Sequence, residues 1–152
     1  MKNLLVARTS TVCGGSFLEY LVPELKEHFK DIQVLLFIPY ARPGGISHQA
    51  YTDLVSQALN DFPFVVKGVH EFENPQAAIQ QAEAIFIGGG NTFVLLDQLH
   101  RQGLIAPLRQ FLEKGKPYLG TSAGSNIVGP NVKTTNDMPI VHPESLTALG
   151  AI

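Results

Sequence analysis

A serine with a glycine two positions away on either side stands at residues 120–124, in the sequence Gly-Thr-Ser-Ala-Gly. The motif follows a short apolar run and precedes a possible helix over residues 123–128, which is the context of a nucleophile elbow. An elbow needs small residues at these two places, because the strand and helix backbones approach each other closely. Ser122 is therefore a candidate nucleophile, and the Ala123 amide would point toward a developing oxyanion. An ordinary glycine turn is the alternative interpretation.

Three successive glycines at residues 88–90, followed by Asn91, end a second apolar run. Successive glycines cost conformational entropy, so a reason for them is expected. Unshielded N–H groups at this turn could complete an oxyanion hole. A purely structural turn is one alternative. Phosphate binding is another, but the run has neither the G-x-G-x-x-G spacing nor the Lys-Ser/Thr of a P-loop.

A nucleophilic serine also needs a base and a group that orients the base. Of the five histidines, His28 and His100 fall late in expected helices, and only His142 follows Ser122 in the sequence. None is a convincing base. The histidines are scattered without H-x-x-H or H-E-x-x-H spacing, so no metal site is expected. Asp137 lies in a polar loop downstream and could approach the same edge, or could serve as an Asx turn or a surface charge.

Short apolar runs alternate with helical stretches, which predicts a three-layer α/β fold with helices on both faces of a mostly parallel sheet. The expected strands are residues 4–8, 33–39, 64–69, 84–87 and 117–119. One helix is expected to begin near Ser16 and another near Pro75, and three more are expected over residues 47–59, 93–101 and 104–114. Ligands of such sheets bind outside the carboxyl ends of the strands. Both glycine-rich turns are therefore expected at one site.

The composition fits one domain over residues 1–152, with 45% hydrophobic residues and a mass of 16.5 kDa. Eleven Lys and Arg against thirteen Asp and Glu give a net charge of −2, so no nucleic-acid partner is expected. The apolar runs are too short to cross a membrane, and the N-terminus has no signal-peptide core, so we expect a cytoplasmic protein. The single cysteine, Cys13, forms no disulfide framework or thiolate metal site.

Three segments, residues 88–93, 120–124 and 134–141, together closely resemble the peptidase E family. That family comprises the α-aspartyl dipeptidases, which are serine peptidases with a fold similar to that of the class I glutamine amidotransferases. The resemblance extends from the N-terminal strand to Ile152. It implies a cofactor-free hydrolase, expected to be monomeric, that removes the N-terminal aspartate from Asp-Xaa dipeptides through an acyl-enzyme.

The resemblance also implies six site residues within these segments. They are Ser122 and Asp137 for catalysis, Gly90 and Ala123 for the oxyanion hole, and Gly89 and Asn91 for substrate contact. In the family the catalytic histidine follows the Asn-Asp-Met-Pro segment at a distance that places it beyond Ile152. The peptidase domain is therefore expected to be incomplete at its C-terminal end.

Two other functions stay open at this point. The Gly-Thr-Ser-Ala-Gly turn alone does not distinguish a dipeptidase from a cyanophycinase-like peptidase acting on β-aspartyl bonds, although the segment at residues 136–139 favours the dipeptidase. A truncated, non-catalytic homologue that binds small ligands would need no base.

Overall fold

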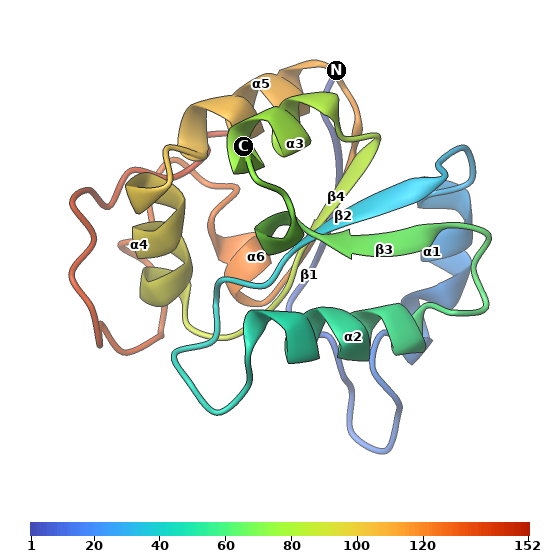
Figure 1. Cartoon of the computed structure of the whole chain (residues 1–152). Helices are drawn as coiled ribbons and strands as arrows, with labels where there is room; N and C mark the ends of the chain where they lie inside the picture. Colours follow the sequence, from blue (N-terminus) through green and yellow to red (C-terminus); the bar gives the residue numbers. More distant parts are fainter.

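Five parallel strands form one sheet in the computed structural model, which describes residues 1–152. The strand order is β1-β5-β4-β2-β3, and four of the strands, β1, β4, β2 and β3, are labelled in Figure 1. The strands are β1 (Asn3–Ala7), β2 (Val34–Ile38), β3 (Val65–Gly68), β4 (Ala84–Ile87) and β5 (Pro117–Thr121). All five lie at the positions that the apolar runs predict, to within a few residues.

Helices cover both faces of this sheet, so the three-layer prediction is confirmed (Figure 1). The α-helices are α1 (Val22–His28), α2 (His48–Ala58), α3 (Pro75–Gln81), α4 (Thr92–Arg101), α5 (Ile105–Glu113) and α6 (Ala123–Asn126). Strand β4 shows how one sheet serves two cores. Ile85 and Ile87 belong to the core beneath α3, α4 and α5, whereas Ala84 and Phe86 belong to the core beneath α1 and α2. Burial on both faces explains why this strand has no polar residue.

The N-terminal helix begins later than the sequence predicts. Ser16 is not its N-cap, because the residue before α1 is Leu21; the Ser16 N–H donates to the Glu19 carboxylate at 2.7 Å. A short 3₁₀ helix at Glu19–Leu21 comes first, and α1 follows with Pro23 in its first turn. Proline has no N–H and is tolerated only at the start of a helix, so regular α-helix cannot begin a turn earlier.

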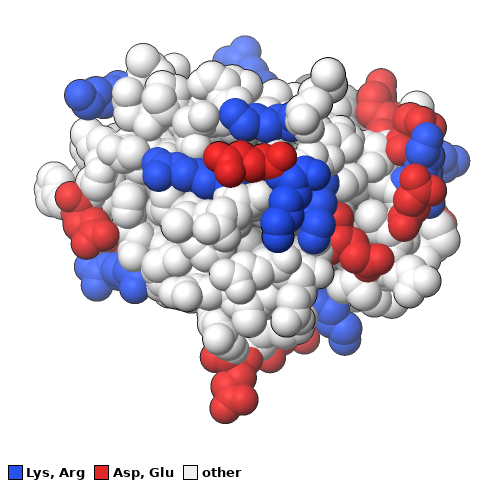
Figure 2. Space-filling view, turned by 90° about the horizontal axis from the view of Figure 1, so that it is seen from above, with Lys and Arg blue, Asp and Glu red and all other residues white.

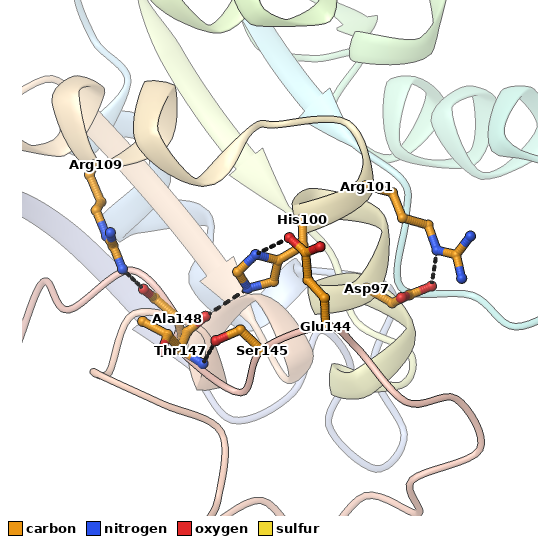
Figure 3. A network of polar contacts seen from close by, with 8 residues as sticks. All are labelled: Asp97, His100, Arg101, Arg109, Glu144, Ser145, Thr147 and Ala148. Atoms are coloured by element: carbon orange, nitrogen blue, oxygen red, sulfur yellow. Dashed lines mark hydrogen bonds and ion pairs between the residues drawn. The ribbon is translucent and has the colours of Figure 1, made fainter.

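Residues 131–152 contain no regular helix or strand and are fixed by side chains of α4 and α5. His100 on α4 bonds the carbonyl oxygen of Thr147 through Nε2 at 2.9 Å (Figure 3). Arg109 on α5 donates to the carbonyl oxygen of Ala148 at 2.5 Å. These contacts give His100 a structural role far from the glycine-rich turns.

Charges of both signs are mixed on the surface. Figure 2 shows basic side chains grouped around an acidic one near the middle of this face, and both signs intermixed at one side. None of the helices has the length and apolar character that a membrane span requires.

Candidate active site

Ser122 lies between the end of β5 and the start of α6, in a strained backbone conformation. Its φ of 51° and ψ of −111° are rare for a residue with a side chain, and such conformations cost about 1–3 kcal/mol. The Ser122 N–H donates to the Ala7 carbonyl oxygen at 2.9 Å, which extends the β1–β5 pairing by one residue. The side chain is partly exposed, and its hydroxyl makes no hydrogen bond within the chain. Ser122 therefore has the geometry of an accessible nucleophile on an elbow.

The two glycines of the elbow are required by close contacts of the backbone. A Cβ atom at Gly120 would lie 2.4 Å from the carbonyl oxygen of Gly124. A Cβ atom at Gly124 would lie 2.0 Å from the carbonyl oxygen of Ile87 on β4. The buried Tyr118 hydroxyl donates to the Gly124 carbonyl oxygen at 2.6 Å, and burial raises the pKa of Tyr118, so this donor stays protonated. An ordinary surface turn needs none of these contacts.

The turn at residues 88–91 packs directly against the elbow. A Cβ atom at Gly89 would lie 3.1 Å from the Cβ of Ser122. Gly90 has a φ of 150°, and a Cβ atom there would lie 2.3 Å from the Ala41 carbonyl oxygen, so a side chain is excluded. The Asn91 N–H donates to the same oxygen at 2.7 Å. The structure thus brings the two glycine-rich turns together, as their places after β4 and β5 predict.

Backbone N–H groups at both glycine-rich turns are free. Gly89, Gly90 and Ala123 donate their N–H to no group of the protein. Free N–H groups at a turn and at the start of a helix can stabilise negative charge on a carbonyl oxygen. Gly90 and Ala123 are the residues expected for the oxyanion hole, and their assignment to it stays a prediction.

Asn91 holds the second turn in place through both ends of its amide. Its oxygen accepts from the N–H groups of Phe93 and Val94 at 3.0 and 3.1 Å, which caps α4. Its nitrogen donates to the Met138 carbonyl oxygen at 2.8 Å. Contact between Asn91 and substrate remains a prediction, but the amide already has these structural partners.

Asp137 lies at the N-terminus of α4, where its carboxylate accepts from the Thr92 N–H at 2.7 Å and from the Thr92 hydroxyl. Asn126 on α6 donates to the same hydroxyl oxygen at 2.9 Å. Asp137 makes no hydrogen bond to Ser122, and a charge-relay role stays a prediction. Thr92 and Asn126 are not among the site residues expected from the sequence. The Asn-Thr pair before an apolar helix was a capping signal that marked this terminus.

None of the histidines forms a hydrogen bond with Ser122. His28 lies at the opposite end of β5, 2.9 Å from the Tyr118 carbonyl oxygen, and burial lowers its pKa. His48 on α2 lies beside His70, which is in the 3₁₀ helix Val69–Glu71 after β3, and burial, then the charge of His70, lower the pKa of His48. His142 is exposed. No group of three or more His, Cys, Asp or Glu residues could hold a metal ion.

A cavity of about 400 Å³ opens between the β2–α2 loop, α4 and residues 140–141. Arg42 lines it, and its guanidinium lies 4.8 Å from the ring centroid of Tyr51. Arg42 forms no ion pair, so its charge is free to interact with an acidic ligand. Arg42 is not predictable as a site residue from the sequence, because only the fold places the β2–α2 loop beside the 88–91 turn.

A parallel α/β sheet with a strained serine at the carboxyl ends of its strands defines a hydrolase-like fold with a nucleophile elbow. The family model of Peptidase family S51 matches residues 4–152. The chain belongs to this family.

Known proteins similar to the chain include two curated relatives and a solved structure. "Peptidase E" of Shewanella denitrificans is 43% identical over 150 residues, and "Probable alpha-aspartyl dipeptidase" of Drosophila melanogaster is 40% identical over 154 residues. Each match covers 99% of this chain and 63% of the relative, so the chain spans less than two thirds of their length. A crystal structure from Listeria monocytogenes EGD-e, described as a candidate peptidase E, is 26% identical in sequence and superimposes with a TM-score of 0.78. The match covers 100% of this chain and 76% of the Listeria chain.

Proposed function

We propose that this chain supplies the nucleophile and oxyanion hole of a serine dipeptidase that hydrolyses Asp-Xaa dipeptides. The observation that carries the proposal is the strained Ser122, which lies beside two unbonded N–H groups at the meeting of two glycine-rich turns. Membership of Peptidase family S51 and the names of the curated relatives support peptide hydrolysis as the reaction.

The chemistry begins with attack of the Ser122 oxygen on the scissile carbonyl carbon. The carbonyl oxygen becomes negative and accepts from the N–H groups of Gly90 and Ala123. Collapse of this intermediate expels the amine of the second residue and leaves an aspartyl ester on Ser122, which water hydrolyses. The base that takes the serine proton is not assigned to a residue of this chain, since no histidine bonds to Ser122.

An acidic substrate fits the charge at this edge of the sheet. The Arg42 guanidinium is free of ion pairs and lines the cavity beside α4, and the preceding residue, Ala41, accepts a hydrogen bond from the Asn91 N–H of the 88–91 turn. Arginine binds carboxylates strongly, because its planar group can donate two parallel hydrogen bonds. The carboxylate of an Asp-Xaa substrate would therefore find a partner there.

The test compares hydrolysis of Asp-Leu and its β-aspartyl isomer by the full-length product of the gene that encodes this sequence. We expect Asp-Leu to be cleaved and Ser122→Ala to lower kcat by at least about 10³-fold. Ser56→Ala, which removes a serine hydroxyl from α2, is the matched control and should retain full activity. Activity that survives Ser122→Ala would refute the proposal, and a preference for the β-aspartyl isomer would favour a cyanophycinase-like activity instead. A full-length product that neither cleaves substrate nor reacts with a serine-directed phosphonate would be a binding protein.

A further inference from the structure

Tyr51 on α2 lies directly behind the 88–91 turn. Its ring is 1% exposed and packs edge-on against Phe37 at a centroid distance of 4.9 Å, and the Arg42 guanidinium lies 4.8 Å from the centroid. The hydroxyl donates to the carbonyl oxygen of Gly89 at 3.1 Å. A Cβ atom at Gly88 would lie 2.3 Å from this hydroxyl oxygen. The first glycine of the run therefore leaves room for the tyrosine.

The hydrogen bond to the Gly89 carbonyl oxygen also fixes the direction of the Gly90 N–H. The C=O of Gly89 and the N–H of Gly90 belong to one planar trans peptide, so they point in opposite directions. A donor that holds the carbonyl oxygen on the Tyr51 side therefore directs the N–H away from Tyr51. The Gly90 N–H has no partner in the protein, and neither has the Gly89 N–H.

A peptide between two glycines is unusually free to rotate. Glycine reaches conformations on both sides of φ = 0 at little steric cost, so the Gly89–Gly90 unit could turn over without a clash of side chains. Rotation by half a turn would present the carbonyl oxygen of Gly89, instead of the N–H of Gly90, on the unpartnered side. An oxygen there would repel a developing oxyanion. The tyrosine hydroxyl favours the productive orientation, because only that orientation satisfies it.

We propose that Tyr51 is a positioning residue, which holds the Gly89–Gly90 peptide so that the Gly90 N–H faces the reacting carbonyl. This inference rests on the proposed function, because it assigns Gly90 to the oxyanion hole. Burial raises the pKa of Tyr51, so its hydroxyl stays a donor across the neutral range.

The kinetic test is Tyr51→Phe in the full-length gene product, with Thr52→Val as the matched control. Thr52 lies on the same helix and is also buried, and its hydroxyl donates to the His48 carbonyl oxygen at 2.8 Å within that helix. Loss of an oxyanion donor costs about 10²–10³-fold in kcat. Loss of its positioning group should cost about tenfold in kcat with KM nearly unchanged, because the bond acts mainly in the transition state. Thr52→Val should leave both constants unchanged.

A second measurement, by NMR, does not depend on activity. The ¹³C shift of the Gly89 carbonyl and the exchange rate of the Gly90 amide should both change in Tyr51→Phe and stay constant in Thr52→Val. An unchanged kcat in an active Tyr51→Phe enzyme would overturn the proposal, as would unchanged NMR signals. If the wild-type protein cleaves no Asp-Xaa peptide, the proposed function fails, and the NMR comparison alone then decides whether Tyr51 orients this peptide.

Discussion

The two glycine-rich turns of the site are held in different ways. The elbow at residues 120–124 depends largely on its own backbone: its glycines pack against each other and against Ile87, and the strained Ser122 pairs with Ala7. The 88–91 turn depends on groups from several distant segments, among them the Tyr51 hydroxyl and the Ala41 carbonyl oxygen. A turn built from three glycines has little stiffness of its own, so its geometry must come from neighbours.

The largest effect should follow from breaking the elbow with Gly124→Ala. The new methyl group would lie 2.0 Å from the Ile87 carbonyl oxygen, which is backbone of a central strand and cannot yield. We expect the free energy of unfolding to fall by about 3 kcal/mol or more, measured by urea denaturation. Gly44→Ala, at a position with no atom within 4 Å, is the control and should change it by no more than about 1 kcal/mol. Equal losses in the two variants would contradict the close-packed elbow.

A smaller effect should follow from Asp137→Ala. Asp137 is far from the 88–91 turn in the sequence, but its carboxylate bonds to Thr92, directly after that turn. The Thr92 N–H and hydroxyl would lose their acceptor. We expect a loss of about 1–2 kcal/mol in the free energy of unfolding, the usual range for a helix cap. Asp61→Ala, an exposed carboxylate with no hydrogen bond, should change stability by less than about 0.5 kcal/mol. If Asp137→Ala were as stable as the wild type, the segment at residues 131–143 would not support this turn.

The smallest effect should follow from relief of the strain at Ser122. This change should raise the free energy of unfolding, whereas the two changes above should lower it. Glycine adopts the observed φ of 51° without the penalty that a side chain imposes. Ser122→Gly should therefore unfold with a free energy about 1 kcal/mol higher than Ser122→Ala, and both variants should lack activity. The comparison uses two variants without the hydroxyl, so it isolates the backbone. A Ser122→Ala protein more stable than Ser122→Gly would show that the elbow is not strained.

The same contrast explains what the sequence could and could not predict. The strands, the capping of α2 by Ser47 and the elbow all follow from residues close together in the chain. The late start of α1 was also marked locally, by Pro23. The role of Tyr51 was not predictable, because its partner lies 38 residues away and only the β2–β4 pairing brings them together. The bond from Asp137 to Thr92 spans 45 residues and depends on packing in the same way.

The pairing of β1 with β5 sets the order in which the site can assemble. β1 has only β5 as a neighbour in the sheet, and the paired residues Asn3 and Pro117 are more than a hundred positions apart. A protein is synthesised from its N-terminus, and contacts between distant segments form slowly. Strand β1 therefore cannot pair in this sheet until residues 117–121 have been synthesised and have left the ribosome. The hydrogen bond from the Ser122 N–H to Ala7 depends on the same pairing, so the backbone of the elbow takes its final form only after these two distant segments have met.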